Sequence, residues 1–182
     1  FALHAAASSP QVRGLAMIAA TPRFVRDGDW PHAVEGRVFA QFGDDLRNDY
    51  AGTLERFLAL DTMGSEHARS ELRTLKHDLY ARGEPAPGAL QQGLHLLEQS
   101  DLRATLPALS VPTLWLAGRR DLLVPAKAMQ ASAAAPPQAP FVQIAGGGHA
   151  PFLGHAHSVA ADVDRFMQAL PMPIVMGMVA GV

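Results

Sequence analysis

Cysteine is absent from the 182 residues of the sequence, and its absence excludes several kinds of chemistry. Without thiols the chain has no disulfide framework, no thiolate nucleophile and no cysteine ligand for zinc. Charge is also scarce, since charged residues make up 18% of the chain and the formal net charge is -2. A chain this close to neutral lacks the basic surface that nucleic-acid-binding proteins present. We therefore expect no nucleic acid partner.

Targeting signals and long apolar runs are missing as well. The opening stretch "FALHAAASSP" has no basic segment ahead of an apolar one, as a secretion signal would. Residues 172–182 form an apolar tail, but they are fewer than the roughly 20 residues that a membrane-spanning helix needs. We expect a cytoplasmic protein with no membrane partner, and we assign the tail no function.

Three short apolar runs have the composition of strands that are buried on both faces of a parallel sheet. They are "GLAMIAA" around residues 15–19, "PTLWLAG" from Pro112, and "PFVQIAG" from Pro140. Helix-favouring segments alternate with these runs. Strands and helices alternating at this spacing indicate parallel strands joined by right-handed crossover helices.

A helical block separates the first run from the second. Residues 46–64 are predicted to form a helix ending at Gly64, and residues 65–83 a helix with Ser65 as its N-cap. Residues 86–106 supply a further helix and a connector. The predicted fold class is α/β, in which residues 1–28 and 110–171 form a core and residues 29–109 an inserted all-helical cap.

Two ionisable residues follow successive strands of the predicted core. Asp121 comes after "LWLAGRR", and His149 comes after "VQIAGGG". Loops at the carboxyl ends of parallel strands share one edge of the sheet, so these two side chains can meet. An acid that holds one ring nitrogen of His149 leaves the other nitrogen free as a general base. Taken singly, Asp121 also fits a turn aspartate and His149 an incidental loop residue; together they indicate catalysis.

The neighbouring histidines do not extend this pair into a metal site. His155 and His157 precede "SVAADVDRF", where Ser158 is a candidate helix cap, so we expect both to be surface residues. A metal site needs convergent ligands, and no residue nearby completes a set. We expect neither a metal nor another cofactor.

The expected third member of the set is a serine, which the sequence does not supply in the usual motif. In α/β-hydrolases the order is serine, then acid, then histidine, and the serine stands on a G-x-S-x-G elbow between a strand and a helix. No G-x-S-x-G occurs in this sequence. Its expected place is ahead of Phe1, where the first predicted helix lacks a preceding strand. We therefore expect this chain alone to be inactive.

The segments "ERFLALDTMG", "GRRDLLVP" and "GGGHAPFLGH" together carry a family resemblance. They resemble the carboxylesterases of biotin synthesis that cleave the methyl ester of pimeloyl-acyl-carrier protein, which are α/β-hydrolases with a helical cap. The resemblance spans nearly everything from Phe1 to about Leu170. It implies that the chain is the C-terminal part of an α/β-hydrolase fold.

The resemblance also implies roles for particular residues. Asp121 matches the triad acid and His149 the base. A cap segment matches the lining of the acyl pocket, with aspartate at its end where the family usually has glutamine; it comprises Phe57, Leu58, Ala59, Leu60 and Asp61. The basic residues that match those docking the acidic carrier protein are Arg56, Arg69 and Arg73, while Gly52 stands where another arginine is expected. Arg69 and Arg73 share a helix face, which is also compatible with an ordinary solvated surface.

Two classes of function remain open from the sequence. The first is an esterase acting on a short-to-medium acyl ester, presented on acyl carrier protein or as another small ester or lactone. The second is a non-catalytic fragment or interaction module on the same fold. We expect a monomer once the fold is complete.

Overall fold

The computed structural model describes residues 1–137 and 139–171 of the chain, so the predicted tail at 172–182 lies outside the described residues. Over this range the chain forms a parallel sheet of strands β1 (Leu15–Ile18), β2 (Thr113–Gly118) and β3 (Phe141–Ile144). The order is β1-β2-β3, with Leu15 paired to Thr113 and Trp115 to Phe141. The three apolar runs are parallel strands, as predicted. The expected burial on both faces holds for β2 alone, because Ala16 of β1 and Gln143 of β3 are exposed.

Helices cover both faces of this sheet, which explains why its central strand is apolar throughout. On one face, Trp115 and Ala117 of β2 pack with α1 (Ala2–Ser8) and α6 (Ala126–Ala133). On the other face, Leu116 packs with Ile144 and with Val159 of α8 (Ala156–Gln168). Every residue of β2 is buried. Each large apolar side chain removed from water in this way stabilises the fold by about 1.5–3 kcal/mol.

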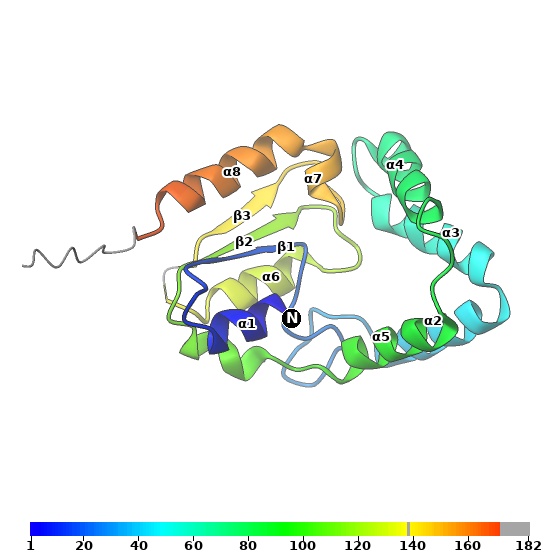
Figure 1. Cartoon of the computed structure of the whole chain (residues 1–182), viewed down its shortest axis with the longest axis horizontal. Coiled ribbons are helices and arrows are strands. Elements are labelled where there is room, and N and C mark those ends of the chain that lie inside the picture. The colour runs from blue at the N-terminus through cyan, green and yellow to red at the C-terminus, as the bar shows by residue number, and fades with distance from the viewer. Residues whose placement is uncertain (138, 172–182) are drawn as a thin grey trace, which may run out of the picture.

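The cap helices occupy the chain between β1 and β2. They are α2 (Gly36–Asn48), α3 (Tyr50–Thr62), α4 (Ala68–Tyr80) and α5 (Pro87–Gln99), followed by the 3-10 helix η1 (Arg103–Ala108). Figure 1 shows them beyond the carboxyl ends of the strands, with α4 beside the short helix α7 (Pro151–Gly154). The stated division into core and cap stays a prediction.

Contacts between Pro22–Arg23 and Asp101–Leu102 bring the start and the end of the helical block together. The Leu102 amide donates to the Pro22 carbonyl at 2.9 Å, and the Arg23 guanidinium pairs with Asp101 at 2.6 Å. The side chains of Arg103 and Arg23 hold the pKa of Asp101 well below its usual range. The two ends of the helical block therefore lie side by side, which is compatible with the predicted insertion.

The structure corrects three helix boundaries. The predicted helix over residues 46–64 is two helices, because Asp49 leaves the helical conformation and its side chain accepts from the Gly52 amide as the N-cap of α3. Ser65 is not the N-cap of α4, which begins after His67. Ser158 lies inside α8, whose N-cap residue is His155.

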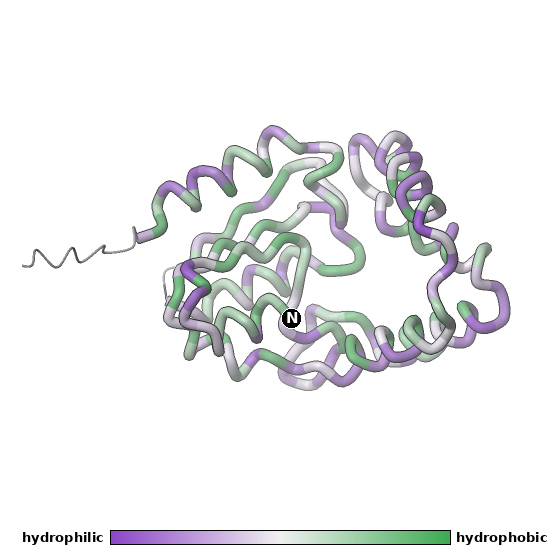
Figure 2. Tube along the Cα trace, in the orientation of Figure 1, coloured by the Kyte–Doolittle hydropathy of each residue, from purple (hydrophilic) through white to green (hydrophobic). Residues whose placement is uncertain are grey.

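Hydropathy follows this division between sheet and cap. Figure 2 shows hydrophobic colour running through the strands, while hydrophilic and hydrophobic stretches alternate along the cap helices. None of the helices in the described part of the chain combines the length and the apolar character needed to cross a bilayer.

The carboxyl end of β2 passes very close to the loop that follows β3. A Cβ atom placed on Gly118 would lie 1.9 Å from the Gly148 carbonyl oxygen and 2.7 Å from that of Gly147. Both obstacles are backbone atoms, so a rotamer change cannot relieve the clash. A glycine at the end of β2 is therefore required for the two loops to lie this close together.

Gly118→Ala is expected to lower the free energy of unfolding by about 1–3 kcal/mol or more, because the added methyl group displaces the Gly147–Gly148 backbone. Urea unfolding followed by circular dichroism measures the change. Gly93→Ala in α5 is the matched control, since its Cβ meets nothing within 4 Å. There the substitution is expected to stabilise the helix by up to about 1 kcal/mol. Equal stability of Gly118→Ala and the unmodified chain would contradict the proposed close approach.

Candidate active site

Asp121 lies in the turn after β2, and both oxygens of its carboxylate have hydrogen-bond partners. One oxygen, Oδ1, accepts hydrogen bonds from the amides of Leu123 and Val124, each at 2.8 Å. The other oxygen, Oδ2, lies 2.9 Å from Nδ1 of His149. The side chain is fully buried. Asp121 is therefore both a turn aspartate and the partner of His149, so the two interpretations of this residue are compatible.

His149 is placed by the glycine loop after β3. Backbone hydrogen bonds join this loop to the one that carries Asp121: the Arg119 amide donates to the Ile144 carbonyl at 3.0 Å, and the Arg120 amide to Gly147 at 2.9 Å. These bonds fix the separation of the two loops independently of the side chains. The hydrogen bond between Asp121 and His149 thus forms on a backbone that already holds its partners together.

The Asp121 contact determines which nitrogen of His149 is free. A carboxylate accepts, so Nδ1 of the ring carries the proton and Nε2 is left to act as a base. Burial on its own lowers the pKa of His149, but the hydrogen bond and the charge of Asp121, together with the charge of Asp61, raise it above its ordinary value. The arrangement suits an imidazole that accepts a proton at Nε2 and is stabilised as the cation.

The cap is attached directly to the loops that carry this pair. The His149 amide donates to the Asp61 carbonyl at 3.3 Å, and the Glu66 amide donates to the Gly146 carbonyl at 3.0 Å. The Arg120 guanidinium donates to the Gly64 carbonyl at 3.1 Å. The segment between α3 and α4 therefore lies against the edge of the sheet at which Asp121 and His149 meet.

Asp61 brings a second carboxylate to the histidine. Its Oδ1 lies 3.8 Å from Nε2 of His149, and its side chain is only 10% exposed. Burial raises the pKa of Asp61, while the charge of His149 acts in the opposite direction. Within the predicted pocket segment, the Asp61 side chain thus contacts His149.

The rest of the predicted pocket segment is divided between buried and exposed positions. Leu58 is buried, Ala59 is exposed, and Phe57 and Leu60 are half-buried. The ring of Phe57 stacks near Phe42, with ring centroids 5.3 Å apart. This segment turns about one helix, α3, so its side chains cannot all face one cavity. Its role in lining an acyl pocket stays a prediction.

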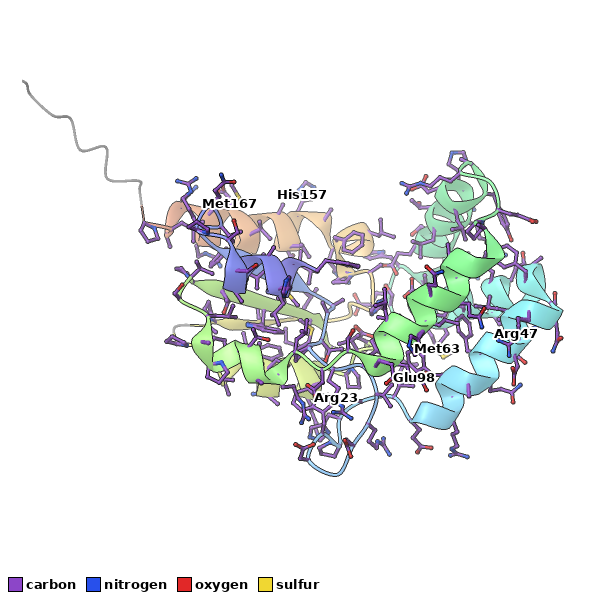
Figure 3. The ribbon with its side chains drawn as sticks, turned by 60° about the horizontal axis from the view of Figure 1, so that its bottom comes forward. Arg23, Arg47, Met63, Glu98, His157 and Met167 are labelled. Carbon is purple, nitrogen blue, oxygen red and sulfur yellow. The ribbon has the colours of Figure 1, made fainter. Side chains whose placement is uncertain are left out.

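A groove of about 1020 Å³ lies elsewhere in the cap, between α2 and α5. Arg47 of α2 and Glu98 of α5, both labelled in Figure 3, contribute to its lining. The lining includes neither Asp121 nor His149. The groove is therefore separate from the catalytic pair.

The three predicted docking arginines are all exposed. Arg56 of α3 lies 3.5 Å from the Asp49 carboxylate and donates to the Thr53 hydroxyl. Arg69 and Arg73 lie one turn apart on α4, and across the described residues neither forms an ion pair. Their place on the cap is compatible with docking, which stays a prediction.

The sequence did not reveal a buried polar cluster where α4 meets α7. Glu71 is only 2% exposed and accepts from the Ser65 hydroxyl at 2.7 Å. His155, the N-cap residue of α8, is partly exposed, and His157 is exposed as predicted and lies on α8 (Figure 3). The rings of His155 and His67 lie 5.2 Å apart. Within residues 1–137 and 139–171, no three acidic or histidine side chains converge as metal ligands would.

A paired aspartate and histidine at the carboxyl edge of a parallel sheet, with helices inserted between the strands, fit one class of protein. Residues 1–156 match the family model of the alpha/beta hydrolase fold, and the chain belongs to this family. An esterase from Exiguobacterium antarcticum has a similar structure, with a TM-score of 0.82 and 20% sequence identity; the match covers 92% of this chain and 62% of that one.

Curated relatives within the family are much closer in sequence. The chain is 67% identical over 171 residues to the pimeloyl-acyl-carrier-protein methyl ester esterase of Xanthomonas axonopodis pv. citri, covering 94% of this chain and 68% of the relative. It is 65% identical over 170 residues to the esterase of the same name from Stenotrophomonas maltophilia, covering 93% and 66%. The chain thus spans about two thirds of the length of these relatives.

The raised pKa of His149 predicts how pH affects stability. The folded chain holds this proton more tightly than the unfolded chain, whose histidine has a pKa of about 6.5. The contribution of His149 to stability is therefore complete below that pH and is lost as pH rises through the folded pKa. The free energy of unfolding, measured in urea between about pH 6 and about pH 9, should fall more for the unmodified chain than for His149→Gln.

His157→Gln is the control for this pH comparison, because His157 is exposed on α8. It should keep the pH dependence of the unmodified chain. Identical pH slopes for His149→Gln and the unmodified chain would contradict the raised pKa.

Proposed function

We propose that the chain supplies the acid and the base of a serine-type carboxylesterase that hydrolyses the methyl ester of a pimeloyl group on acyl carrier protein. The observation that carries the proposal is the contact of 2.9 Å between the buried Asp121 carboxylate and Nδ1 of His149. The names of the relatives at 67% and 65% identity support the choice of substrate.

The proposed chemistry assigns His149 two proton transfers in each half of the reaction. Nε2 of His149 takes the proton of a serine hydroxyl while the serine oxygen attacks the ester carbonyl, and Asp121 stabilises the resulting imidazolium. The same proton then passes to the departing methoxide, which leaves as methanol. In the second half, His149 deprotonates water for attack on the acyl-enzyme and returns the proton to the serine oxygen, which releases the free acid.

The experiment must supply a serine nucleophile, because the sequence contains no G-x-S-x-G. The test protein is therefore a chimera in which a strand and serine elbow from the Xanthomonas esterase precede Phe1. We expect the chimera to hydrolyse the methyl ester of pimeloyl-acyl-carrier protein and the 182-residue chain alone to show no turnover. His149→Ala or Asp121→Asn in the chimera should lower kcat by about 10⁴-fold.

Two histidine variants of the chimera serve as a control and as a test. His157→Ala, which changes an exposed histidine of α8, should leave turnover unchanged. If a folded chimera were inactive, or if its His149→Ala variant kept its rate, the esterase function would be refuted. Equal rates on unrelated small esters or lactones would support a general hydrolase in place of the pimeloyl enzyme.

Docking of the carrier protein is tested by binding to the chain itself. Arg69 and Arg73 present two positive charges on one face of α4, neither of them ion-paired within the described residues, and these charges complement an acidic partner. Reversing both, Arg69→Glu with Arg73→Glu, should weaken binding of pimeloyl-methyl-ester-loaded carrier protein by about tenfold. Isothermal titration calorimetry at low salt measures the affinity.

Arg165→Glu on α8 is the matched control for charge reversal. Its side chain is 73% exposed and pairs with Asp162 of the same helix, and Figure 1 shows that α8 runs along the sheet away from the cap helices. It should bind the carrier protein as the unmodified chain does. Unchanged affinity of the doubly reversed chain would show that α4 is not the docking surface.

A further inference from the structure

His149 lies between two carboxylates. A catalytic triad accounts for Asp121 but not for Asp61. Asp121 contacts Nδ1 at 2.9 Å, and Asp61 faces Nε2 at 3.8 Å from the opposite side of the ring. The two acids come from different parts of the fold, since Asp121 follows β2 and Asp61 is in the last turn of the cap helix α3. Their meeting at one imidazole is therefore a property of the docked cap.

The contact at Nε2 is unfavourable unless a proton is present. Because Nδ1 donates to Asp121, Nε2 of a neutral ring presents a lone pair, and an ionised carboxylate only accepts. Two acceptors would then face each other in a largely buried place. Oδ1 of Asp61 has no hydrogen-bond partner within the described residues. A proton on Nε2 removes the repulsion and turns the contact into an attraction between opposite charges.

Asp61 is held in this position by the backbone. Its carbonyl accepts from the His149 amide at 3.3 Å, so the main chain and the side chain of one residue both contact the histidine. The following residue, Thr62, is buried, and its hydroxyl bonds to the Leu58 and Ala59 carbonyls. These contacts fix the backbone of the last turn of α3, from which the Asp61 side chain extends toward His149.

We propose that Asp61 is a positioning residue that acts through His149, keeping the proton on Nε2 and so setting the pH at which the base becomes available. The proposal rests on the proposed function, in which Nε2 of His149 must be free to take the serine proton. An esterase with this arrangement gains its base at a higher pH than one with a neutral residue at position 61. The family glutamine implied by the resemblance is such a neutral residue.

Other charged groups around the junction contribute to the same equilibrium. Asp121 adds a negative charge on the far side of the ring. Burial is the largest effect that raises the pKa of Asp61, and the negative charge of Glu71 on α4 raises it further. Nearby charged or titratable side chains include Glu66 against Gly146, Arg120 against the Gly64 carbonyl, His67 against Gly154, and His155 beside His67. Among these groups, Asp61 is the carboxylate that faces Nε2.

The test is a pH titration of His149 in the 182-residue chain by nitrogen-15 NMR, which reports the protonation of each ring nitrogen separately. In the unmodified chain near neutral pH, both Nδ1 and Nε2 should carry protons. In Asp61→Asn, Nε2 should lose its proton at a pH lower by about one unit or more, while Nδ1 stays protonated. A merely structural role for Asp61 would not change the protonation of one nitrogen selectively.

Two further variants make the result decisive. Asp164→Asn removes a carboxylate on α8 that bonds to Gln168, and it should titrate as the unmodified chain does. If Asp61→Asn loses its dispersed amide spectrum, Asp61→Gln provides a second neutral variant. The carboxyl carbon of Asp61 in the unmodified chain provides a measurement without any substitution. Its carbon-13 shift should change at the pH at which His149 titrates.

The proposal is overturned if His149 titrates at the same pH in the unmodified chain and in a folded neutral variant, or if Nε2 is unprotonated near neutral pH. Because the NMR titration measures protonation and not turnover, its result is independent of whether the esterase function is correct. An inactive chimera with the predicted shift would refute the esterase alone, and an active chimera without it would refute only the role of Asp61.

Discussion

The site depends on the close crossing of two stretches of backbone at the carboxyl edge of the sheet. Gly118 ends β2 directly against the carbonyls of Gly147 and Gly148, and amides of the Asp121 loop donate to the loop that leads to His149. This crossing brings an acid and a histidine 28 positions apart within hydrogen-bond distance. Since the backbone fixes the geometry, the side chains lose little freedom when they pair.

The cap adds chemistry to the site in addition to covering it. Its segment from Asp61 to Glu66 bonds to the loop of His149, so the position of α3 and the environment of Nε2 are coupled. An imidazole between two carboxylates favours its charged form more strongly than one with a single partner. Movement of the cap would thus change the acidity of the base together with access to it.

The sequence predicted the sheet and the Asp121–His149 pair because both depend on local signals. Apolar runs mark strands that are buried on both faces, and loops after parallel strands share an edge. It did not predict the break at Asp49, where a side-chain cap competes with helix continuation, or the burial of Glu71, which arises only when α4 meets α7. The approach of Asp61 to Nε2 also depends on how α3 packs against the sheet. Helical spacing in the sequence places Asp61 on α3 but does not show which residue it faces.

The proposed activity requires above all that Asp121 hold the Nδ1 proton of His149 in a buried hydrogen bond. Proton NMR of the chain measures this directly, through the resonance of that proton. We expect a strongly downfield signal that exchanges slowly with water, couples to Nδ1 of His149, and disappears in Asp121→Asn. If a folded chain shows no such signal, or if the signal persists in Asp121→Asn, the assignment of Asp121 and His149 as acid and base is contradicted.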